Sequence, residues 1–174
     1  MSATLKLQNV RLSFPAIFRK AVFNGVETKY EATFLMPKGS PQHKQTQDAI
    51  DAFLAEKFQG KTPKGLKVTC FTDGDDKDYD GYEGQMALKG GSTKRLLVID
   101  RDKTPLTDED GRIYAGCYVN AIIEFWYSDH PLGGKQILGN LFGVQFAKDG
   151  DAFGDNKGVT YDDFDDFDEL DDEF

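Results

Sequence analysis

The chain has 174 residues, of which 21 are basic and 30 are acidic, so its formal charge is −9. No apolar stretch approaches the roughly 20 residues of a membrane-spanning helix, and the opening MSATLKLQ lacks the basic and apolar regions of a signal peptide. We therefore expect a cytoplasmic protein without membrane contact, in which Cys70 and Cys117 are buried thiols. Aromatic residues at 13% and 18 glycines favour a turn-rich, mostly β domain.

The first part of the chain predicts a β-hairpin. Residues 5–18 alternate apolar and polar as a strand does, but the phase slips at Gln8-Asn9, which indicates a β-bulge. The dipeptide Asn24-Gly25 is typical of a tight turn. A second alternating stretch at residues 28–36 then completes the hairpin.

One main α-helix is predicted at about residues 41–58. Ser40 can cap its N-terminus, and Pro41 suits the first helical position. Apolar residues recur at helical spacing up to Phe58, and Gln59-Gly60 ends the pattern.

An acidic loop, DGDDKDYDGYEG, follows a short predicted strand at residues 66–72. Its Asp76, Asp78, Asp80 and Gly81 match the first half of an EF-hand loop. The twelfth position is Ala87, where a bidentate Glu is required, so we do not expect a calcium site or any other metal site.

The second half of the chain predicts further strands. Residues 85–101 indicate two strand pieces around Gly90-Gly91, and residues 116–128 indicate the strongest strand, with one face made by Cys117, Val119, Ala121, Ile123 and Phe125. In residues 136–147 the alternation places Leu138, Asn140, Phe142, Val144 and Phe146 on one face. Gly139 and Gly143 leave the other face bare, where a second backbone or a flat ligand can approach.

The chain ends in an acidic tail. Nine of the fourteen residues 161–174, YDDFDDFDELDDEF, are acidic, and without them 21 basic residues face 21 acidic ones. So acidic a segment is expected to be disordered alone, yet its apolar residues recur every three or four positions, as on one side of a helix. We interpret it as a partner-binding segment that folds when bound, through Phe164, Phe167, Leu170, Asp171, Asp172, Glu173 and Phe174. A merely solvated end is the alternative.

The sequence contains few of the residues and motifs from which active sites are usually built. His43 and His130 stand in unlike settings, and hydrolase, zinc-protease, redox and dinucleotide-binding motifs are absent. Asp100 and Asp102 could hold magnesium in a nuclease, but their basic neighbours favour a solvated turn. We expect a non-enzyme without a cofactor.

Basic and aromatic residues are interleaved in the neutral body. Cations neutralise phosphates while rings stack on bases of any sequence, which suits single-stranded nucleic acid. The candidate residues are Lys89, Lys94, Arg95, Arg101, Lys103, Arg112, Tyr114, Tyr118 and Trp126. Tyr118 and Trp126 could equally be core residues, and the cations could form an ordinary charged surface.

Three stretches resemble phage-encoded single-stranded DNA-binding proteins. They are KRLLVIDRDKTPLTDEDGRIYAG from Lys94, the following CYVNAIIEFWYSD, and GVQFAKDGDAFG from Gly143; FPAIF and the acidic loop also fit. The resemblance implies an OB-fold-like Greek-key barrel at residues 1–148, followed by a linker and acidic C-terminal tail at residues 149–174. It also implies binding of single-stranded DNA without sequence preference, in phage replication or recombination within the bacterial host.

The tail is then expected to compete with DNA for the positive groove and to recruit replication or recombination proteins. Two other functions are left open. An acidic DNA mimic or adaptor would bind a host DNA-binding protein and have no DNA affinity of its own, whereas a metal-dependent nuclease would degrade DNA when magnesium is present. A homo-oligomer is also left open.

Overall fold

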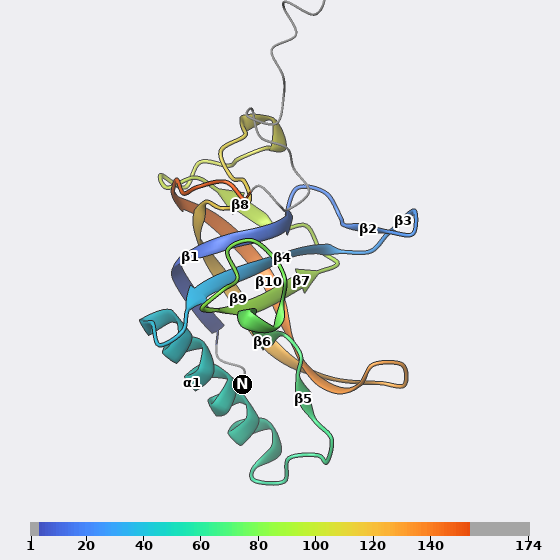
Figure 1. Ribbon diagram of the computed structural model, residues 1–174. Coiled ribbons are helices and arrows are strands. Elements are labelled where there is room, and N and C mark those ends of the chain that lie inside the picture. Colours follow the sequence, from blue (N-terminus) through green and yellow to red (C-terminus); the bar gives the residue numbers. More distant parts are fainter. Residues whose placement is uncertain (1–3, 154–174) are drawn as a thin grey trace, which may run out of the picture.

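The computed structural model describes residues 4–153 of the protein. Five long strands form a closed barrel in the order β10–β9–β1–β4–β7, and β7 returns to β10 through a parallel bridge between Gly91 and Asn140. This is the OB architecture, a five-stranded Greek-key barrel, as predicted (Figure 1). The barrel strands are β1 (Thr4–Ala16), β4 (Tyr30–Pro37), β7 (Gln85–Ser92), β9 (Tyr118–His130) and β10 (Gly134–Lys148).

Two bulges bend β1. The register with β9 shifts between Leu7 and Val10, so the predicted bulge at Gln8-Asn9 is confirmed. The register with β4 shifts between Ser13 and Ala16, where Phe14 has a positive φ of 47°. Each bulge increases the local bend of the strand. The bent β1 can therefore pair with β9 along its first part and with β4 along its second part.

The predicted helix is confirmed as α1 (Pro41–Phe58). Along the chain it follows β4 and precedes β7, and in space it packs at one end of the barrel (Figure 1). Ser40 caps it by accepting a hydrogen bond from the His43 N–H at 3.1 Å, and Gln59 ends it in the left-handed conformation. Phe58 meets Tyr127 of β9 edge to face at 5.2 Å.

The remaining elements are short. A two-stranded ribbon surrounds Asn24-Gly25, and the strand expected at residues 66–72 is divided in two. They are β2 (Val22–Phe23), β3 (Val26–Glu27), β5 (Lys67–Val68), β6 (Phe71–Asp73), the 3-10 turn Gly74–Asp76, β8 (Leu97–Ile99) and the 3-10 turn Asp108–Asp110. No helix within residues 4–153 is long and apolar enough to cross a membrane.

Residues 85–101 form two strands, β7 and β8, as predicted, but the expected break at Gly90-Gly91 is wrong, because both glycines lie inside β7. A Cβ on Gly90 would stand 3.2 Å from the Leu141 Cβ. The small residue is therefore needed where β7 crosses β10 inside the barrel and does not mark a turn.

The predicted face of residues 136–147 is also wrong, because β10 has a bulge. Its register with β9 shifts between Leu141 and Gly143. Phe142 consequently stays outside, whereas Val144 and Phe146 turn into the core. The expectation of a close backbone at Gly139 is confirmed, since a Cβ there would stand 2.9 Å from the Lys89 carbonyl oxygen.

A second apolar cluster lies outside the barrel and includes Phe153. This ring packs with Leu35, Tyr82 and Ala87, and the Arg11 guanidinium lies 4.1 Å above it. Residues 149–153, which we expected to belong to the linker, thus pack on the barrel. The predicted tail at residues 161–174 lies outside the described residues.

Both cysteines are buried free thiols, as predicted. Burial raises the pKa of the Cys70 thiol to about 12 and also raises that of Cys117. Neither thiol is therefore a reactive thiolate near neutral pH.

Candidate nucleic-acid interface

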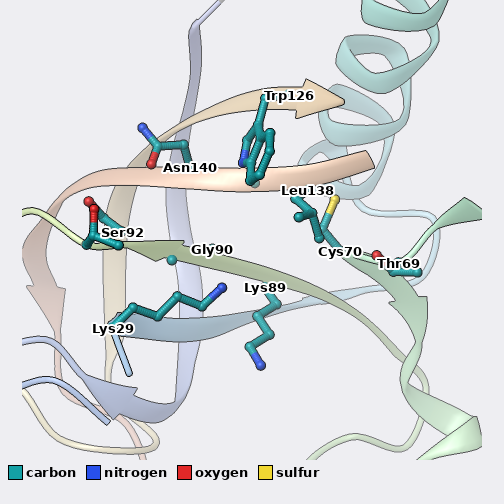
Figure 2. A pocket seen from close by; sticks show the side chains of 12 residues that line it. Lys29, Thr69, Cys70, Lys89, Gly90, Ser92, Trp126, Leu138 and Asn140 are labelled. Carbon is teal, nitrogen blue, oxygen red and sulfur yellow. The ribbon is translucent and has the colours of Figure 1, made fainter. Parts of the chain in front are cut away.

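A surface groove of about 440 Å³ lies where β7 crosses β10, and we call it the β7–β10 groove (Figure 2). In the OB fold, oligonucleotides bind on the second and third barrel strands between the first and last hairpin loops. Those strands are β4 and β7 here; β7 supplies Lys89 to Ser92 to the groove and Lys29 immediately precedes β4, so the groove adjoins that face. It is lined by Lys29, Thr69, Cys70, Lys89, Gly90, Gly91, Ser92, Thr93, Trp126, Leu138, Gly139 and Asn140.

Two lysines supply the positive charge of the groove. The stem of Lys29 crosses Gly91, where an added Cβ would stand 3.0 Å from the Lys29 Cε. The Lys89 Nζ lies 3.3 Å from a Glu31 carboxylate oxygen, and the Lys89 side chain is 56% exposed. Both ammonium groups can therefore reach a phosphate, although Lys89 must first leave Glu31.

Trp126 supplies an aromatic surface on the same groove. It is 46% exposed and is paired across the strands with Leu138. The core alternative for Trp126 is therefore excluded. Figure 2 shows its ring near Leu138 and Asn140, with Lys89 projecting from β7 and Lys29 from the position just before β4. An exposed indole can stack on a base, and the Asn140 amide can donate to or accept from one.

Three of the predicted residues lie at or beside this groove. Lys89 and Trp126 line it, and Lys94 directly follows the lining residue Thr93 in the exposed β7–β8 loop. Arg95, in the same loop, lines a separate depression with Leu97 and Leu106. Lys29 and Asn140 were not predicted. No local motif singles out Lys29, and only the neighbouring Gly139 indicated that this part of β10 lies close to another backbone.

Arg101, Lys103 and Arg112 lie in the β8–β9 connection, away from the β7–β10 groove. Arg101 lines a separate small polar depression, and Lys103 occupies a turn with a positive φ of 70°. Arg112 is engaged within the fold, because its guanidinium lies 4.1 Å over the Phe146 ring and 3.2 Å from an Asp100 oxygen.

Tyr114 and Tyr118 hold the segment that follows β10. The Tyr114 hydroxyl donates to the Asp149 carboxylate at 2.9 Å, and burial, aided by that carboxylate, raises the pKa of Tyr114. The Tyr118 ring has the Lys148 ammonium 4.8 Å from its centre, and it closes against Gly150. Tyr114 packs against the edge of the core, Tyr118 is half-buried outside it, and neither ring lines the groove.

Lys38 is one of the residues that hold the acidic loop against the barrel. The Lys38 ammonium lies 2.7 Å from an Asp73 oxygen and also contacts Asp75. These hydrogen bonds lower the pKa of both carboxyl groups and raise that of Lys38. Within residues 4–153, no group of three or more His, Cys, Asp or Glu side chains is arranged to hold a metal ion.

A family model described as the ssDNA-binding protein of Enterobacter phage Enc34 matches residues 3–174. The chain belongs to this family. A relative, putative protein p50 of Acyrthosiphon pisum secondary endosymbiont phage 1, is 39% identical and aligns over 97% of this chain and 96% of that protein.

Solved structures agree with the family. The single-stranded DNA-binding protein of bacteriophage Enc34, solved in complex with ssDNA, is 29% identical, with a TM-score of 0.71 over 87% of this chain and 89% of that one. The single-stranded DNA-binding protein gp2.5 of bacteriophage T7 has a TM-score of 0.59 over 94% of this chain and 93% of that one. Because gp2.5 is only 14% identical, it supports the fold alone.

Proposed function

We propose that this protein binds single-stranded DNA without sequence preference in the β7–β10 groove. Lys29 and Lys89 contact phosphates, and a base stacks on Trp126. The observation that carries the proposal is the exposed tryptophan beside two lysines on the oligonucleotide-binding face of an OB barrel. Ring stacking and phosphate contacts read no base edges, so such a site tolerates any sequence.

The protein acts without catalysis, in phage DNA replication or recombination in the cytoplasm of the bacterial host. Family membership supports this role. The exposed cations and the aromatic surface of the groove are suited to holding a strand.

The acidic tail competes with DNA for the groove. The described body ends at Phe153, which packs against Leu35 of β4 and Ala87 of β7. These strands carry Glu31 and Lys89, so the described chain ends on the same pair of strands that holds the Lys89–Glu31 ion pair beside the groove. Its nine acidic residues are the anions that the lysines would attract when DNA is absent.

Displaced by DNA, the tail offers its apolar residues and the terminal Phe174 to replication or recombination proteins. The spacing of these residues on one helical side supports a partner with an apolar groove and a basic rim.

The test compares the full-length protein with a version that ends at Thr160. Fluorescein-labelled oligo-dT is titrated with each, and anisotropy is read at about 50 and 200 mM salt, a range over which phosphate contacts weaken strongly. We expect both to bind and the truncated version to bind more tightly, with the difference shrinking as salt rises.

Lack of binding by either version at low salt would contradict the proposal and favour the acidic DNA mimic. Shortening of the oligonucleotide with magnesium, but not with EDTA, would indicate a nuclease.

A further inference from the structure

The outer face of the β9–β10 hairpin continues beyond the groove and is apolar. Ile122 is 38% exposed, Phe142 is 45% exposed, and Leu97 of the adjoining β8 is 62% exposed. Gly143 pairs with Ile122 on one side and with Leu97 on the other, so these side chains are neighbours. We call Ile122, Phe142 and Leu97 the Phe142 surface.

The bulge in β10 sets Phe142 apart from the strand pairing. The register passes from Leu141–Ile123 directly to Gly143–Ile122, which leaves Phe142 without a cross-strand partner. Val144 and Phe146 turn inward after the bulge, whereas the Phe142 ring stays in solvent. Bulges often re-aim a side chain next to a functional site.

Cations border the Phe142 surface on both sides. β10 meets β7 at Asn140 and meets β8 at Gly143, so the β7–β8 loop with Lys94 and Arg95 borders this stretch of β10. Across β9, Lys6 of β1 is exposed and pairs with Ile122. Among the outward-facing residues of β9 from Tyr118 to Trp126, the single carboxylate is Glu124.

We propose that Phe142 is a second base-stacking platform and that single-stranded DNA leaves the groove past Trp126 and crosses the Phe142 surface between Lys6 and the Lys94 loop. The proposal rests on the proposed function and extends its site. Trp126 pairs with Leu138, four positions before Phe142, so the two rings are about 13 Å apart along the strand. One strand can therefore stack on both.

The positive borders favour DNA over a second copy of the chain as the occupant. In a two-fold symmetric dimer the same patch meets itself, which would bring Lys6 and the Lys94 loop of each copy against like charges. A polyanion with apolar bases satisfies both the cations and the exposed rings.

The test uses Phe142→Leu, which keeps an apolar side chain but removes the ring, and Phe142→Tyr, which keeps the ring. Each is titrated with oligo-dT of about 4 and about 16 nucleotides, the range of OB site sizes. For Phe142→Leu we expect affinity for the longer oligonucleotide to fall about 5- to 100-fold and affinity for the shorter one to stay unchanged. Phe142→Tyr should retain wild-type affinity for both.

Tyr79→Leu is the matched control, because Tyr79 is 47% exposed, lies in the acidic loop, and packs on Phe14 instead of the Phe142 surface. We expect it to bind like wild type. Equal affinity of Phe142→Leu and wild type for the longer oligonucleotide would overturn the inference and leave the groove function intact. So would a change in sedimentation for Phe142→Leu without a change in DNA binding, which indicates a protein contact. Failure of wild type to bind any oligonucleotide would instead remove the proposed function and this inference together.

Discussion

Replacing Glu31 with Gln should strengthen DNA binding. The Glu31 carboxylate lies 3.3 Å from the Lys89 Nζ, and these side chains are 23% and 56% exposed. An ion pair this open to solvent contributes about 0–1 kcal/mol. A phosphate must displace Glu31 from Lys89, so removing the carboxylate should raise the affinity for oligo-dT by up to about fivefold.

Salt dependence should change together with affinity. Binding of a phosphate by Lys89 releases cations from the DNA, but the displaced Glu31 carboxylate attracts a cation in turn and offsets part of that release. The neutral amide of Glu31→Gln attracts none. The slope of log K against log salt should therefore steepen by up to about 0.7 for a single strand. Anisotropy titrations at four or five salt concentrations measure both quantities.

Asp48→Asn is the matched control for Glu31→Gln. It removes one negative charge from an exposed ion pair, 2.7 Å from the Lys44 Nζ, on α1 and away from the groove. The reasoning is refuted if Glu31→Gln binds no more tightly than wild type at low salt. It is also refuted if Asp48→Asn gives an equal gain, because the effect would then reflect net charge.

Three further predictions follow from contacts in the fold. Gly91→Ala should have the Tm of wild type but bind oligo-dT more weakly in anisotropy titrations, since the added Cβ displaces only the Lys29 stem. Gly139→Ala should lower the Tm, because its Cβ would stand 2.9 Å from a backbone carbonyl oxygen. A lowered Tm for Gly91→Ala together with an unchanged Tm for Gly139→Ala would contradict this packing. Phe153→Ala should lower the free energy of unfolding by about 3 kcal/mol, and Tm by roughly 6–12 °C in thermal melts; an unchanged Tm would show that residues 149–153 add nothing to the body. Lys38→Met should have a lower Tm than wild type at pH 7, and this difference in Tm should disappear as the pH falls below 3.8. The pKa values of Asp73 and Asp75 are lowered in the folded state, so their contact with Lys38 stabilises the fold above pH 3.8 and is lost as the carboxylates become protonated below it. A difference in Tm that persists at pH 2 would contradict this reasoning.

Local signals in the sequence predicted much of the fold. Ser40-Pro41 and Gln59-Gly60 identify both ends of α1, because capping chemistry depends on neighbouring residues alone. The alternation in β9 correctly assigned its buried face, and the slip at Gln8-Asn9 correctly placed a bulge.

Barrel closure could not be predicted from local pattern. The bulge at Phe142 changes which residues of β10 face inward, and an unbroken alternation gives no sign of it. Gly90-Gly91 resembles a turn in sequence, yet both glycines lie in β7, where Gly90 packs against Leu141 of β10 and Gly91 against the Lys29 stem. Lys29 immediately precedes β4, and the pairing of β4 with β7 lays its stem over Gly91, so its place in the groove depends on contacts distant in sequence.

Emission from Trp126, the single tryptophan of the chain, tests most directly whether the β7–β10 groove holds DNA. We expect oligo-dT to quench it saturably, at the concentrations that raise the anisotropy of the labelled strand, and we expect added salt to reverse both signals. Oligo-dT that binds by anisotropy while Trp126 emission stays unchanged would place the DNA elsewhere and contradict the assignment of the groove.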